Sequence, residues 1–106
     1  PAAPEVKART VSLLSPAAVT VAKGAPYKVV GIVRPAKPGL HAWRQVSVNG
    51  EWKTLQKGTT TKKGRYAFAI AKAKGVGTQS YRVLIVRKKT VVGVSPEFSV
   101  TVQPRQ

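Results

Sequence analysis

The sequence predicts an all-β chain that folds as an antiparallel β-sandwich of about 7–8 strands. Apolar and polar residues alternate with a period of two along most of the chain, and the alternating stretches are rich in Val, Thr and aromatic residues. Turn-forming stretches such as SPAA, RPAKPG, VNGE and TKKG separate them. A long helix is not expected, because the helix-forming run AIAKAKG soon meets two glycines.

The first half of the chain supplies three alternating stretches and one hairpin. TVSLL, AVTVA and YKVVGIVRP are expected as strands, and the positions on one face of each are Val11, Leu13, Val19, Val21, Tyr27, Val29, Gly31 and Val33. AWRQVSV and EWKTLQ follow, joined by Asn49-Gly50. This dipeptide is the sharpest turn signal in the chain, because a type I′ hairpin needs positive φ at both central positions.

The second half of the chain supplies the expected core face. In GRYAFAI, SYRVLIVRKK and EFSVTVQ, apolar and aromatic side chains take every second position. We expect these residues to be buried together: Tyr66, Phe68, Ile70, Tyr81, Val83, Ile85, Phe98 and Val100.

Length and composition indicate one domain. A chain of 106 residues can bury a hydrophobic core without metal or disulfide cross-links, and this chain contains no Cys. The expected boundaries are 1–8 for an N-terminal tail or linker, 9–103 for the sandwich and 104–106 for a C-terminal tail. The purely apolar runs are only a few residues long, so we expect no membrane-spanning segment in this sequence.

The charge of the chain is strongly one-sided. Lys and Arg number 19 against three glutamates and no Asp, which gives a formal net charge of +16. Because such self-repulsion opposes the compact state, the charge favours a polyanionic partner or an unusual habitat, with a solvated surface of no specific role as the alternative. The candidate polyanion-binding residues fall at expected strand ends: Lys62, Lys63, Arg65, Arg87, Lys88 and Lys89. If their strands run in opposite directions, these clusters share one pole of the sandwich, and Lys72 and Lys74 lie at the other.

Catalytic and metal chemistry lack the residues that they need. A hydrolase triad requires a base and an orienting carboxylate, and His41 is the single histidine beside three scattered glutamates. One His without Cys or Asp cannot close a zinc shell, and a calcium site lacks its carboxylates. We therefore expect no enzyme activity, no cofactor and no metal, and we expect His41 in an exposed loop.

Several motifs occur in a fixed order over roughly residues 9–103: VAKGAPYKVVGIVRP, VNGEWKTLQKGTTTKKGRYAFAI, YRVLIV and GVSPEFSVTV. This set resembles the bacterial immunoglobulin-like repeats of secreted and cell-wall proteins from high-G+C Gram-positive bacteria. The resemblance implies an Ig-like or fibronectin-III-like sandwich in an exported protein, often one of several tandem copies, that serves as a non-catalytic spacer, adhesion or binding unit at the cell surface. The repeats share no catalytic residues, so none is transferred. The chain departs from them in its high basic charge and in Ala42 and Arg44, which take positions that are normally apolar.

The kind of partner stays open at this point between an anionic polymer and an acidic protein. Nucleic acid would be bound non-specifically, because no sequence-reading motif accompanies the charge. Anionic envelope polymers, acidic polysaccharides or phospholipid headgroups suit an exported domain better. Trp43 is the candidate exposed aromatic contact, able to stack on a sugar or to anchor a protein, whereas Trp52 is expected to pack across its strand pair. We expect a monomer or one unit of a tandem array.

Overall fold

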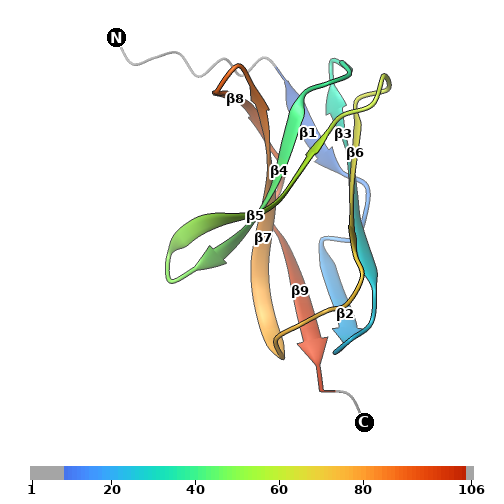
Figure 1. The fold of residues 1–106 in the computed structure, drawn as a ribbon, viewed down its shortest axis with the longest axis vertical. Coiled ribbons are helices and arrows are strands. Elements are labelled where there is room, and N and C mark those ends of the chain that lie inside the picture. The colour runs from blue at the N-terminus through green and yellow to red at the C-terminus, as the bar shows by residue number, and fades with distance from the viewer. Residues whose placement is uncertain (1–8, 105–106) are drawn as a thin grey trace.

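The computed structural model describes residues 9–104, and over this range the chain forms β-strands and no helix (Figure 1). The strands are β1 (Thr10–Leu13), β2 (Ala18–Ala22), β3 (Tyr27–Arg34), β4 (His41–Val48), β5 (Glu51–Thr59), β6 (Arg65–Ile70), β7 (Gly77–Arg87), β8 (Thr90–Val94) and β9 (Phe98–Gln103). The all-β prediction is confirmed. The expected tail at 1–8, and the expected tail at 104–106 apart from residue 104, lie outside the described residues.

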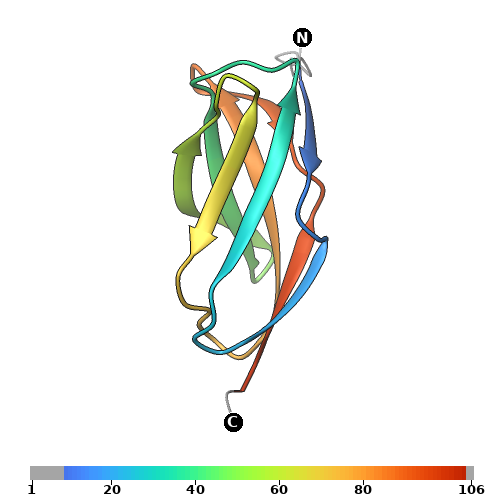
Figure 2. The same cartoon turned by 90° about the vertical axis from the view of Figure 1, so that its right-hand side faces the viewer.

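The strands form two facing sheets, as Figure 2 shows from the side. One sheet has the order β1-β3-β6, and the other has the order β2-β9-β7-β4-β5, with β8 paired to β7. The prediction of a purely antiparallel sandwich is wrong at one place, because β2 runs parallel to β9. The backbone N–H groups of Leu14 and Ser15 both donate to the Val30 carbonyl at the end of β1. Pro16 has no N–H to extend that pairing, and the chain crosses to the other sheet without reversing.

The strand count exceeds the predicted seven or eight because of β8, which follows a two-residue turn at Lys88-Lys89. The long strand β7 pairs with β9 along its first half and with β8 along its second half. Ser95 lies between the two partners. Its N–H donates to the Val83 carbonyl at 2.8 Å, and its hydroxyl oxygen accepts from the Val83 N–H at 2.8 Å, so β7 stays hydrogen-bonded where its partner changes.

The predicted core face is confirmed in most of its members. Six of the expected residues are buried in one cluster, and Ile70 and Tyr81 are partly buried against it; the six are Tyr66, Phe68, Val83, Ile85, Phe98 and Val100. The Tyr81 and Phe98 rings stack at a centroid distance of 5.7 Å.

A glycine in β3 makes room for the largest fully buried side chain. Tyr66 passes over Gly31, its register partner, and its hydroxyl donates to the Ser12 carbonyl at 3.0 Å. A Cβ atom on Gly31 would lie 2.0 Å from the Tyr66 hydroxyl oxygen. The Tyr66 contact therefore joins all three strands of the smaller sheet, β1, β3 and β6.

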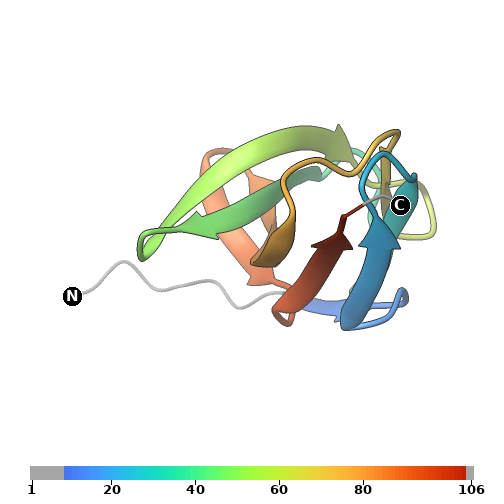
Figure 3. The same cartoon turned by 90° about the horizontal axis from the view of Figure 1, so that it is seen from below.

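The predicted hairpin between β4 and β5 is confirmed. Asn49 and Gly50 have φ angles of 52° and 80°, as a type I′ turn requires. The pairing then shifts between Arg44 and Gln45, where Leu55 is the extra residue of a β-bulge. The tip of this hairpin extends sideways from the sandwich, as seen from below in Figure 3.

Candidate binding site at the basic pole

Three connections meet at the end of the sandwich where β7 ends: 35–40 between β3 and β4, 60–64 between β5 and β6, and the Lys88-Lys89 turn (Figures 1 and 2). The first two are joined through buried Thr60, whose N–H donates to the Leu40 carbonyl at 2.9 Å. The Thr60 hydroxyl accepts from the Leu40 N–H at 3.0 Å and donates to the Lys37 carbonyl at 2.6 Å. These bonds give the loops at this end a fixed backbone.

This end of the molecule carries a dense group of cations, which we call the basic pole: Arg34, Lys37, Lys62, Lys63, Arg65, Arg87, Lys88 and Lys89. The six candidates from the sequence are all among them, and all six are exposed. Lys72 and Lys74 lie in the β6–β7 connection at the opposite end, as the strand directions required. No Asp or Glu occurs in the three connections.

A trough of about 430 Å³ on the outer face of the larger sheet opens beside the basic pole. Its lining residues are His41, Trp43, Lys57, Val86, Lys88 and Lys89. Trp43 is half-buried, and the Lys57 ammonium nitrogen lies 5.0 Å from the centroid of its ring. The trough therefore joins the predicted aromatic contact to two of the predicted cations, and it has an apolar wall with lysines around it.

The turn that carries Lys88 and Lys89 has an unusual backbone for these residues. Their φ angles are 50° and 66°, both in the left-handed region that lysine seldom adopts. Asn-Gly is the residue pair that favours such a turn, as at Asn49-Gly50. Backbone strain of this kind is often found at functional sites. Here the strained turn places two ammonium groups at the rim of the trough.

The second tryptophan also has a cation over its ring, and it does not line the trough. Trp52 is paired with Ser47, but its ring is covered by the Arg82 guanidinium of β7, at 4.4 Å from the ring centroid. The Arg82 Nε–H also donates to the Gln45 side-chain oxygen at 2.9 Å. The expected packing of Trp52 against its paired strand β4 is thus incomplete, because Arg82 comes from β7, on the other side of β4.

The structure also describes the positions of the histidine and of two glutamates that catalytic or metal chemistry would need. His41 is exposed as expected, but it is the first residue of β4 and not part of a loop. Glu51 opens β5 and Glu97 precedes β9. Among residues 9–104, no group of three or more His, Cys, Asp and Glu side chains is arranged to hold a metal. Over the same range there is no helix of the length and apolarity that crossing a bilayer requires.

No protein-family model matches the chain, and the search among curated proteins gave no match. Function is therefore inferred from the geometry and charge of the molecule itself. Sequence reasoning missed Lys57, whose place beside Trp43 depends on the bulge at Leu55. It also gave no role to Arg44 beyond its unusual position, although this residue proves to be buried and to face inward.

Proposed function

We propose that this chain is a non-catalytic, Ig-like module of a secreted or cell-surface protein, and that it binds an acidic polysaccharide through the basic pole and the adjoining trough. Pairing of β3 with β6 in one sheet, and of β4 with β7 and β7 with β9 in the other, supports the Ig-like assignment. It corresponds to the B–E and C–F–G pairs of the immunoglobulin sandwich. The sequence resemblance to exported bacterial repeats supports the location.

The observation that carries the binding proposal is the trough in which Trp43 lies among Lys57, Lys88 and Lys89. A sugar ring has an apolar face that can stack on an indole, and its carboxylate or sulfate groups can pair with ammonium groups around that ring. A polymer of such sugars would extend from the trough along the basic pole. The absence of Asp and Glu from the pole loops adds an attractive field for a polyanion.

Nucleic acid is the second candidate, supported by the same charge. Single-stranded nucleic acid is usually held by several aromatic side chains that stack successive bases. Of the aromatic residues within 9–104, Tyr66, Phe68 and Phe98 are buried in the core, Tyr27 and Tyr81 are partly buried against it, and the Arg82 guanidinium lies over the Trp52 ring. Trp43 alone faces the lysines of the trough, which favours a sugar polymer over a run of bases.

The proposal is tested by calorimetric titration with heparin as the acidic polysaccharide, with neutral dextran and single-stranded DNA for comparison. Trp43→Ala should weaken heparin binding by about tenfold, and Lys88→Gln with Lys89→Gln should weaken it and reduce its salt dependence. The matched control is Lys23→Gln with Lys28→Gln, which removes the same charge away from the pole.

Equal losses in the pole and control variants would show that the charge acts diffusely and would contradict the site. Full retention of affinity in Trp43→Ala, with binding to DNA as tight as to heparin, would favour the nucleic-acid alternative. Failure of both polymers to bind would leave the module as a spacer.

A further inference from the structure

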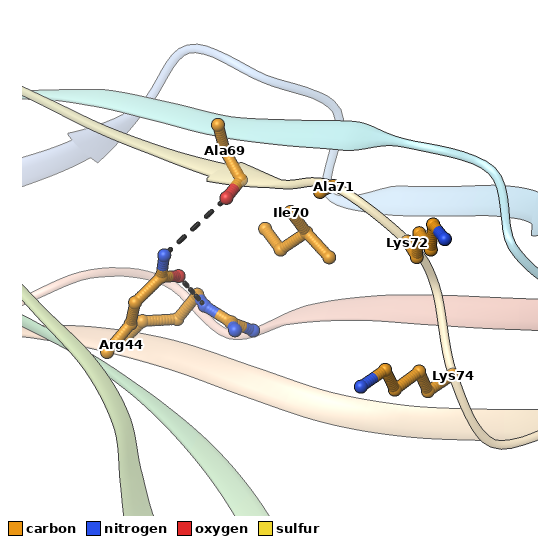
Figure 4. Close-up of a pocket in the computed structure, with 7 residues that line it drawn as sticks. Arg44, Ala69, Ile70, Ala71, Lys72 and Lys74 are labelled. Atoms are coloured by element: carbon orange, nitrogen blue, oxygen red, sulfur yellow. Dashed lines mark hydrogen bonds between the residues drawn. The ribbon is translucent and has the colours of Figure 1, made fainter.

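A second cleft lies between the two sheets, between the edge strands β5 and β6 and the start of the β6–β7 connection (Figure 4). It has a volume of about 330 Å³, and its lining residues are Arg44, Gln56, Ala69, Ile70, Ala71, Lys72 and Lys74. None of them belongs to the basic pole or to the Trp43 trough. The cleft therefore has to be explained separately from the proposed polysaccharide site.

Arg44 is the centre of this cleft, and it is more than nine-tenths buried, with a relative exposure of 8%. Its Nε–H donates to the Gln56 side-chain oxygen at 2.9 Å, and its guanidinium carbon lies 5.5 Å from the centroid of the Tyr81 ring. The Gln56 amide in turn donates to the Ala69 carbonyl at 3.5 Å, which ties the arginine to both walls of the cleft. Its side chain is thus held in one orientation.

The Arg44 guanidinium has one further polar neighbour within residues 9–104, the Tyr27 hydroxyl, whose hydrogen-bond and charge interaction with Arg44 opposes the rise in the pKa of Tyr27. Arg44 lines the cleft, and no fully buried side-chain nitrogen among these residues lacks a partner. In Figure 4 the Lys74 ammonium group points across the cleft toward the Arg44 guanidinium. An arginine guanidinium carries several N–H donors in a planar fork, which matches the oxygens of a phosphate or sulfate.

The charges around the cleft have no internal counter-charge. The lining brings three cations and no carboxylate. Tyr27 packs nearby, but burial raises the pKa of its hydroxyl, and Tyr81 raises it further against the opposing effect of Arg44. The Tyr27 hydroxyl is therefore neutral at physiological pH. A buried guanidinium with an ammonium group across the cleft from it is stabilised when an anion joins the two.

We propose that this cleft binds one compact tetrahedral oxyanion, the phosphate or sulfate group of a small molecule, between the Arg44 guanidinium and the Lys74 ammonium. Lys72 adds positive charge at the mouth. A single phosphate does not fill about 330 Å³, so the cleft also accepts a small substituent against the apolar wall of Ala69, Ile70 and Ala71. The site lies in the half of the molecule opposite the basic pole and does not depend on polysaccharide binding.

The test is an amide chemical-shift titration of the whole chain at constant ionic strength, with inorganic phosphate, inorganic sulfate and glycerol 3-phosphate as probes and acetate for comparison. We expect saturable shifts at residues 69–74 and at the Arg44 Nε–H. Tighter binding of glycerol 3-phosphate than of inorganic phosphate would identify a phosphomonoester as the natural group, and the reverse order would identify the free ion.

Arg44→Met keeps the length of the side chain without its charge and should weaken phosphate binding by about tenfold or more. Lys74→Gln changes an exposed residue in the β6–β7 connection, and it should weaken binding by several-fold. Lys28→Gln, which changes an exposed lysine of β3 that lines neither the cleft nor the trough, is the matched single-charge control and should bind phosphate as the parent does. Heparin binding should persist in Arg44→Met, which separates this proposal from the polysaccharide site.

Linear, unsaturated shifts spread over all lysines, or equal phosphate affinity in Arg44→Met, Lys74→Gln and the parent protein, would overturn the proposal.

Discussion

Replacing Lys88-Lys89 by Asn-Gly should stabilise the fold and weaken polysaccharide binding at the same time. Both lysines have left-handed φ angles, at 50° and 66°, in a turn that Asn-Gly adopts without strain. A non-glycine residue in this region costs about 1–2 kcal/mol. Asparagine relieves part of that cost at the first position, and glycine relieves it at the second but loses about 0.5–1 kcal/mol to its more flexible unfolded state. The double replacement should therefore raise the free energy of unfolding by about 1–2 kcal/mol.

Two measurements check this expectation. Urea unfolding, followed by tryptophan fluorescence, gives the change in stability at an unchanged m-value. Heparin titration at several salt concentrations gives the binding side, where removal of two contacting lysines should lower the slope of log affinity against log salt by about one for each. The reverse exchange at the other hairpin, Asn49→Lys with Gly50→Lys, is the structural control. It should destabilise by a similar amount.

An unchanged or lower stability in the Asn-Gly variant would refute the assigned turn geometry, provided that the control at Asn49-Gly50 behaves as expected. Higher stability with unchanged heparin affinity would leave the turn geometry intact but remove Lys88 and Lys89 from the binding site. The two readouts therefore test the backbone and the site separately.

Three further outcomes are expected. Gly31→Ala should destabilise by about 3–5 kcal/mol, measured by urea unfolding, because its Cβ displaces Tyr66 and breaks the bond to the Ser12 carbonyl; a loss below 1 kcal/mol would contradict this packing. Phe68→Ala, in the same assay, should cost about 3–5 kcal/mol because its ring is buried in the core, and a negligible change would mean that the ring faces solvent. Burial raises the pKa of the Tyr66 hydroxyl above its ordinary value of 10.0, so the folded state holds this proton more tightly than the unfolded state. Its contribution to stability is then present below about pH 10 and is lost as the pH rises above it, and Tyr66→Phe should reduce that alkaline loss in unfolding measured from pH 8 to 12.

Much of the fold could be predicted because its signals are local. Alternation with a period of two identifies most of the strands, and Asn49-Gly50 identifies its hairpin, since each signal depends on residues close together in the chain. β8 could not be found in this way, because Lys88-Lys89 has none of the residues that mark a type I′ turn. The parallel pairing of β2 with β9 could not be found either, since it joins segments some eighty residues apart.

Sequence reasoning predicted most of the cations of the candidate site, but not how the site is assembled. A two-residue turn at Asn49-Gly50 with regular pairing would place Gln56 opposite Trp43. The bulge at Leu55 shifts the register by one residue, so that Lys57 lies opposite Trp43 and Gln56 lies opposite Arg44. That single extra residue assembles both the trough on the outer face and the cleft between the sheets. No residue pattern in the stretch TLQKG predicts this bulge.

Arg44 also bears on whether the chain is only a spacer. The Arg44 side chain faces inward from β4, as does that of fully buried Ala42 two residues earlier. An apolar side chain at position 44 would complete the core. Exchange of a buried charge for an apolar residue of similar volume is often stabilising, by about 1–4 kcal/mol. A domain whose whole role is to hold its neighbours apart gains nothing from the charged residue. Higher stability of Arg44→Met in anion-free buffer, together with loss of the stabilisation that phosphate gives to the parent, is therefore the combination expected of a binding module and not of a spacer.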